Sequence, residues 1–283
     1  MLDIRNILLA TDFEKGSEAA GSAAIELAWV AASKVALCHV LEFQFVHPDV
    51  QQRMQKRLGF LLDEMRTKFE KERVEVIRTS LPVGHPVFEV IREAQEVNAG
   101  LIVVGAGPSE ASRFRVGPVA ESIMLQSPIS VLAVRPGDPP PAFRKVLCAV
   151  DLSTASRESL QSAILLAKHF AAQLIVLMVQ SPSAWSSTLY EAAVPVDMEN
   201  EYRATMTKAL DDFLKDIDFK EVKWSKQIRE GIPATEIVNA CREQDIDVLV
   251  MGAIGGTGIS RLLLGSVSRR VLRNLPCSIL IAR

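Results

Sequence analysis

Glycine and serine residues recur at a fixed spacing near the carboxyl-terminal end of this 283-residue chain. Gly252, Gly255, Gly265 and Ser266 form the pattern G-x2-G-x9-G-S. Glycines let a backbone approach a ligand closely. Gly265 and Ser266 are expected to open a helix, where unpaired N–H groups and the helix dipole favour an anion, and Ser268 adds a hydroxyl there. This chemistry suits a polyphosphate.

Two familiar phosphate-binding loops do not fit this pattern. A P-loop needs a lysine followed by Ser or Thr, and no lysine follows these glycines. The dinucleotide fingerprint follows the first strand of its unit and has an acidic residue at the end of the second. Here the glycines follow the fourth expected strand, and the second expected strand ends in Val179 and Gln180. The sequence therefore predicts a phosphate loop of another kind.

The chain is an internal repeat, and this repeat predicts two domains. Residues 5–12 (RNILLATD) align with 144–151 (RKVLCAVD), and residues 84–106 align with 231–253. The segment between the halves is rich in proline, which continues neither a helix nor a central strand. We expect a first domain, a linker and a second domain over residues 1–136, 137–143 and 144–283.

Each half alternates short apolar runs with longer segments of helical period. In the second half the expected strands are 144–151, 173–180, 220–229, 247–252 and 277–282, and the expected helices are 155–171, 197–217, 233–244 and 265–275. The strand segments are apolar on consecutive residues, as in parallel strands covered on both faces. The pattern predicts an α/β fold in which each half is an open, doubly wound parallel sheet.

Asp151 ends the first expected strand of the second half, and Gly252 ends the fourth. If the strand order is 3-2-1-4-5, these ends flank the point where the winding direction reverses, which is where such sheets bind ligands. Asp151 could instead cap the next helix, a role that Ser153 could also fill.

At these residues the chain resembles a tandem universal stress protein, and the likeness covers essentially both halves. In that family G-x2-G-x9-G-[ST] marks the ATP-binding members, and an Asp and a Val at two strand ends contact the adenosine portion. The resemblance implies an adenine nucleotide alpha hydrolase-like fold and ATP with Mg²⁺ as the ligand. It implies binding residues Asp151, Val179, Gly252, Gly255, Gly265, Ser266, Val267 and Ser268.

The first half departs from this motif where phosphate would lie. It keeps the acid, the valine and two glycines, at Asp12, Val40, Gly105 and Gly117. Pro108 replaces the second motif glycine, Pro118 replaces the serine, and the loop is one residue shorter. Because Pro118 removes a hydroxyl and a backbone donor, we interpret this nucleotide site as degenerate.

Our leading hypothesis is an ATP-binding regulatory protein of the stress response, in which the nucleotide acts as a conformational or partner switch. It assigns no catalytic residue and no metal ligand. One alternative is a slow ATPase or phosphotransferase, although near the motif we find Arg261 and Asp151 but no convincing base. Another is an interaction scaffold that works without nucleotide.

Composition narrows the partners. The net charge is −2, with no basic block for nucleic acid and no apolar run of the roughly 18 residues that cross a bilayer. With no basic leader and four scattered cysteines, we expect a cytoplasmic protein with reduced thiols. A protein partner is expected but not identified, and a homodimer is left open.

Two short, uncharged edge strands are expected at residues 130–134 and 278–282. Uncovered edges expose unpaired backbone groups. In the family that this chain resembles, single-domain members cover this edge by dimerising through it. The resemblance implies that the halves of this chain, which carries both copies, pair through these strands as a pseudo-two-fold pair.

Overall fold

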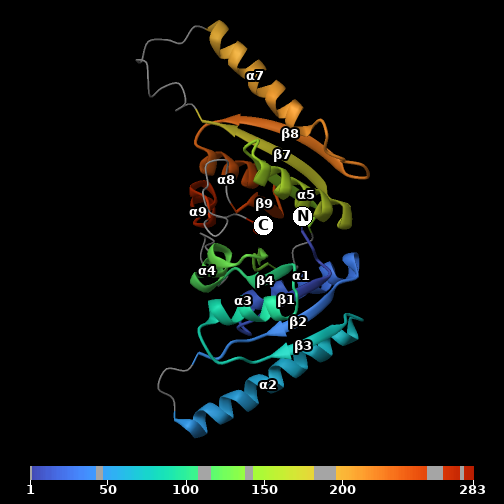
Figure 1. The fold of residues 1–283 in the computed structure, drawn as a ribbon, viewed down its shortest axis with the longest axis vertical. Coiled ribbons are helices and arrows are strands. Elements are labelled where there is room, and N and C mark those ends of the chain that lie inside the picture. Colours follow the sequence, from blue (N-terminus) through green and yellow to red (C-terminus); the bar gives the residue numbers. More distant parts are fainter. Residues whose placement is uncertain are drawn as a thin grey trace.

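The fold is an alternation of strands and helices in both halves of the chain (Figure 1). The computed structural model describes residues 2–42, 47–107, 116–137, 143–181, 196–253, 264–274 and 277–283. The first-half strands are β1 (Asn6–Ala10), β2 (Lys34–Cys38), β3 (Val76–Ser80), β4 (Leu101–Gly105) and β5 (Ser130–Val134). The first-half helices are α1 (Lys15–Ala31), α2 (Pro48–Lys71), α3 (Pro86–Glu96) and α4 (Pro118–Gln126).

The second half repeats this order. Its strands are β6 (Lys145–Val150), β7 (Gln173–Gln180), β8 (Lys223–Glu230), β9 (Val248–Gly252) and β10 (Ser278–Ala282). Its helices are α5 (Thr154–His169), α7 (Val196–Leu214), α8 (Pro233–Glu243) and α9 (Ser266–Leu272). Every element predicted here is present, with ends that differ by three residues or fewer. The predicted linker 137–143 and the domain boundaries stay a prediction, since residues 138–142 lie outside the described part of the chain.

All described strands join one ten-stranded sheet of order β3-β2-β1-β4-β5-β10-β9-β6-β7-β8. Within each half the pairs are parallel, and the order 3-2-1-4-5 is confirmed. The helices form two layers. One apolar core joins α1, α2, α5 and α7 to one face of the sheet, and the other joins α3, α4, α8 and α9 to the opposite face.

The two halves meet at an antiparallel pair of strands, β5 and β10. Ile279 lies opposite Ala133, and Ile281 lies opposite Val131. Every residue of both strands is buried. This confirms the predicted pairing of residues 130–134 with 278–282, and Figure 1 shows α2 and α7 at the two far ends of the joined sheet.

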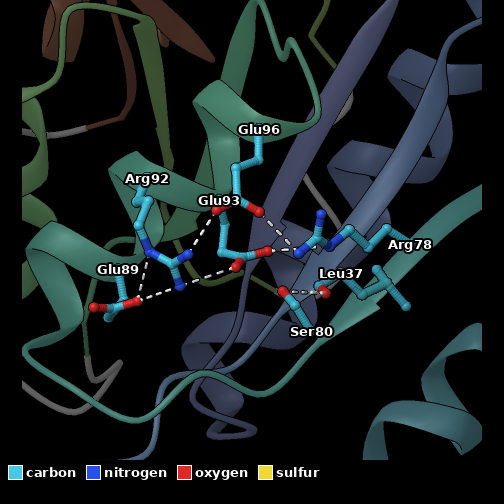
Figure 2. A network of polar contacts seen from close by, with 7 residues as sticks. All are labelled: Leu37, Arg78, Ser80, Glu89, Arg92, Glu93 and Glu96. Atoms are coloured by element: carbon cyan, nitrogen blue, oxygen red, sulfur yellow. Dashed lines mark hydrogen bonds and ion pairs between the residues drawn. The ribbon is translucent and has the colours of Figure 1, made fainter.

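An ion-pair network ties α3 to the edge strand β3 (Figure 2). The Glu93 carboxylate, only 3% exposed, lies 3.3 Å from Arg78 Nε and 3.3 Å from Arg92 Nη2. Glu96 contacts the same two arginines at 2.9 and 2.6 Å. In the second half Arg229 contacts Glu243 of α8 at 2.6 Å. These ion pairs hold α3 and α8 in place. Each helix lines a separate cavity, α3 in the first half and α8 in the second.

No helix within the described ranges is long and apolar enough to cross a membrane.

Candidate functional site

A cavity of about 400 Å³ lies at the carboxyl ends of β6 and β9 in the second half. Seven of the eight sequence-predicted residues line it, namely Asp151, Val179, Gly252, Gly265, Ser266, Val267 and Ser268. The eighth, Gly255, lies outside the described residues, as does Arg261. The strand order explains the convergence, because β6 and β9 are neighbours in the sheet although about a hundred residues separate them. The role of these residues in binding stays a prediction.

Asp151 is held by the turn that joins β6 to α5. Its Oδ1 accepts hydrogen bonds from Ser153 N at 3.1 Å, from Ser153 Oγ at 2.5 Å and from Ser156 Oγ. The backbone N–H of Asp151 donates to Ser156 Oγ at 2.9 Å. Leu152 adopts a φ of 64°, which is rare for a bulky side chain and occurs mainly where the surroundings enforce it. The carboxylate is therefore oriented before any ligand arrives.

The helix cap of α5 is Ser153, whose Oγ accepts from Ser156 N at 3.1 Å. Of the two roles that the sequence left open for Asp151, simple capping thus belongs to Ser153. Asp151 is exposed and lines the cavity.

The loop around the start of α9 is built from backbone contacts. Gly265 is the N-cap, with no side-chain capping bond, and its N–H donates to Ala253 O at 2.8 Å. Ser268 is 5% exposed, and its Oγ donates to Gly252 O at 3.3 Å. Ser268 therefore joins the helix to the end of β9, whereas the Ser266 side chain is exposed at the cavity.

The first half has a smaller cavity, of about 170 Å³, in the corresponding place. Its turn repeats that of the second half, because Asp12 Oδ1 accepts from Ser17 Oγ at 2.5 Å and Phe13 has a φ of 63°. Gly105 is glycine for a packing reason, since a Cβ there would lie 2.6 Å from Gly16 O. Burial raises the pKa of Cys38, on the cavity wall, to about 12, so its thiol stays protonated.

Sequence analysis missed two groups that the structure brings to these cavities. Ser156 and Ser17 each lie five residues after the strand-end Asp, so the repeated D-x4-S could have revealed them. His39 lines the first-half cavity as well. The residues that surround His39 in the cavity come from several segments of the chain, and no local sequence pattern connects these segments.

The described part of the chain contains no group of three or more His, Cys, Asp or Glu side chains that could hold a metal ion. All four cysteines are free and buried.

Comparison with known proteins places both halves in one family. The sequence model described as "Universal stress protein family" matches residues 3–135 and again residues 142–283. Universal stress protein MJ0531 of Methanocaldococcus jannaschii is 31% identical over 146 residues, covering 50% of this chain and 82% of its own length. Universal stress protein YxiE of Bacillus subtilis is 31% identical over 147 residues, covering 50% and 99%.

Among solved structures, a universal stress protein from Archaeoglobus fulgidus superimposes with a TM-score of 0.72. The match covers 99% of both chains at 20% identity, and it shows that the two share their tandem fold.

Proposed function

The chain is a tandem member of the universal stress protein family, and we propose that its second domain binds ATP with Mg²⁺ as a conformational or partner switch. The first domain, in this proposal, does not bind ATP.

The observation that carries the proposal is the shared cavity of Asp151, Gly252 and the Gly265–Ser268 segment. Its volume of about 400 Å³ falls in the range typical of small-molecule sites, roughly 300–1,000 Å³. One end presents an oriented carboxylate and the other presents glycine backbone and the Ser266 hydroxyl. This polarity suits a ligand with hydrogen-bond donors at one end and an anion at the other.

The triphosphate is assigned to the end formed by Gly252, Gly265, Ser266 and Ser268. The nucleoside is assigned to Asp151 and Val179, with apolar contacts from Ile237 and Met251. Mg²⁺ usually reaches such sites on the phosphates, with one or two protein carboxylates at most. This agrees with the lack of a metal-binding cluster among the described residues, so the ion is proposed to arrive as part of the nucleotide.

Catalysis is not part of the proposal. Phosphoryl transfer needs a group that positions the nucleophile and a cation on the transferred phosphate. Among the described residues that line the cavity, Asp151 supplies the carboxylate. Its Oδ1 already accepts hydrogen bonds from Ser153 and Ser156.

Isothermal titration of the full chain with ATP and Mg²⁺ tests the proposal. We expect about one nucleotide per chain. Gly265→Val should abolish binding, because its side chain would occupy the phosphate end. Gly117→Val is the matched control, since Gly117 caps α4 with nearly the same φ and ψ, and among the described residues a Cβ there would meet only Gly107 Cα, at 3.8 Å. Two equivalent sites per chain, or none, would overturn the proposal.

A further inference from the structure

The first-domain cavity differs from the second-domain cavity in size and in its polar groups. We propose that it is a separate binding site for a small planar ring compound that carries N–H donors and no phosphate. This inference does not depend on the nucleotide site proposed for the second domain.

Size sets the first limit on the ligand. The cavity holds about 170 Å³, against about 400 Å³ in the second domain. A protein cavity of about 150 Å³ accommodates benzene. One substituted ring therefore fits, whereas a base joined to a sugar and three phosphates does not.

Charge sets the second limit. Pro118 occupies the first turn of α4, where Ser266 stands in the second domain, so one backbone N–H and one hydroxyl are missing. Glu121 adds a negative charge to the same turn. Both differences disfavour an anionic ligand at this helix terminus.

The polar groups of the cavity are arranged to accept hydrogen bonds. Ser17 Oγ donates its hydrogen to Asp12 Oδ1. His39 Nδ1 lies 2.7 Å from Thr11 O, and because a carbonyl only accepts, Nδ1 carries the proton. In the neutral ring this leaves Nε2 as an acceptor. Asp12 and His39 therefore call for a ligand that donates, such as an amino-substituted ring.

The rim includes an apolar residue, Val119, which lines the cavity and is 46% exposed. Val40, Val90 and Ile123 make the walls apolar as well. Such a rim and walls suit the faces of a ring and not a polyanion.

The experiment is an NMR titration of the full chain, labelled at its methyl groups, with 2-aminopyrimidine at millimolar concentrations. We expect shifts at Val90, Val119 and Ile123. Pyrimidine, which has the same ring without the amino donors, should bind at least about tenfold more weakly. ATP should not displace the ring compound, because it is too large and too negatively charged for this cavity.

Two substitutions test whether the ring compound binds in this cavity. His39→Met introduces the residue found at the aligned position of the second domain, Met178, and should weaken binding about tenfold because it removes an acceptor. Val119→Ser should weaken binding several-fold because Val119 lines the cavity, whereas Val50→Ser, at a valine of α2 that is 39% exposed, should not. The second-domain methyl signals report whether each variant is folded.

Four outcomes would overturn the proposal. They are absence of shifts at the first-domain cavity, equal binding of pyrimidine, displacement by ATP, and unchanged affinity in His39→Met and Val119→Ser. Because the affected methyl groups identify the domain, a failure here is distinguishable from failure of ATP binding in the second domain.

Discussion

The backbone N–H of Arg283, the last residue of the chain, donates to Ser130 Oγ at 3.1 Å across the junction between the two halves. The reverse bond also exists, from Arg135 N to Ser278 Oγ at 3.1 Å. Ser130 begins β5 and Ser278 begins β10. Arg135 directly follows the end of β5, and Arg283 directly follows the end of β10. The Arg283 guanidinium continues to Met124 O and Leu125 O at the end of α4. Hydrogen bonds therefore join the two halves at both ends of the β5–β10 pair, on either side of the pseudo-two-fold axis.

We expect Ser130→Ala and Ser278→Ala to lower the free energy of unfolding by similar amounts, about 1 kcal/mol each. Both serines are buried, and each substitution leaves one backbone N–H without its partner. Urea unfolding measures the effect. Ser22→Ala is the control, because the Ser22 hydroxyl donates within its own helix, to Glu18 O, and its loss should change stability little. A loss for one serine and not the other would contradict the symmetry.

A charge in the junction should be far more costly. Ile279 is fully buried opposite Ala133, so Ile279→Asp places an unpaired carboxylate in an apolar seam and should cost about 3 kcal/mol or more. We expect lower expression and aggregation, measured by unfolding and light scattering. Ile77→Asp, on the edge strand β3, is the control, since Ile77 is 38% exposed. Equal behaviour of the two variants would argue against a buried junction.

Asp151→Ala should weaken adenosine and ATP binding by roughly tenfold to a hundredfold, the value of one charged hydrogen bond. Because this carboxylate also organises the turn through Ser153 and Ser156, a second variant is needed. Asp151→Asn keeps Oδ1 as an acceptor but loses the charge, and it should retain the turn. Titrations with adenosine and with ATP give the affinities. Asp12→Asn, in the first domain, should leave both unchanged.

Two buried thiols predict a loss of stability in alkali. Burial raises the pKa of Cys38 and of Cys148 from 9.0 to about 12 in the folded protein. Above about pH 9 the unfolded chain therefore loses thiol protons that the folded chain keeps, so folding weakens with rising pH. The contribution is intact below pH 9 and is lost between about pH 9 and pH 12, at up to about 1.4 kcal/mol per pH unit and thiol.

Urea unfolding between about pH 8 and pH 10 measures this slope. Cys148→Ala should be less stable overall because it leaves a cavity, yet its stability should fall less steeply with pH. An unchanged slope would mean that the Cys148 thiol does not titrate differently in the folded and unfolded chains.

Much of this fold could be predicted from the sequence because the determining patterns are local. Consecutive apolar residues such as Val248–Met251 mark a strand buried on both faces, and the repeat of 5–12 at 144–151 reveals a second copy. If the strand order is 3-2-1-4-5, the ends of these strands are neighbours, so Asp151 and Gly252 were expected near one another, and β6 does pair with β9. The pairing of β5 with β10 was predicted from two short apolar edges that needed cover, together with the resemblance to the family.

The tertiary structure alone decided how these elements pack. His39 meets Thr11 O across 28 residues of chain, and α3 and α4 bring Pro86 and Val119 to the same cavity. The difference between about 170 and 400 Å³ depends on such contacts. Local sequence determines whether a segment is a strand or a helix, because backbone propensity and periodicity act over a few residues. The shape of a cavity depends on side chains from distant segments filling space together, and that sum exists only in the folded chain.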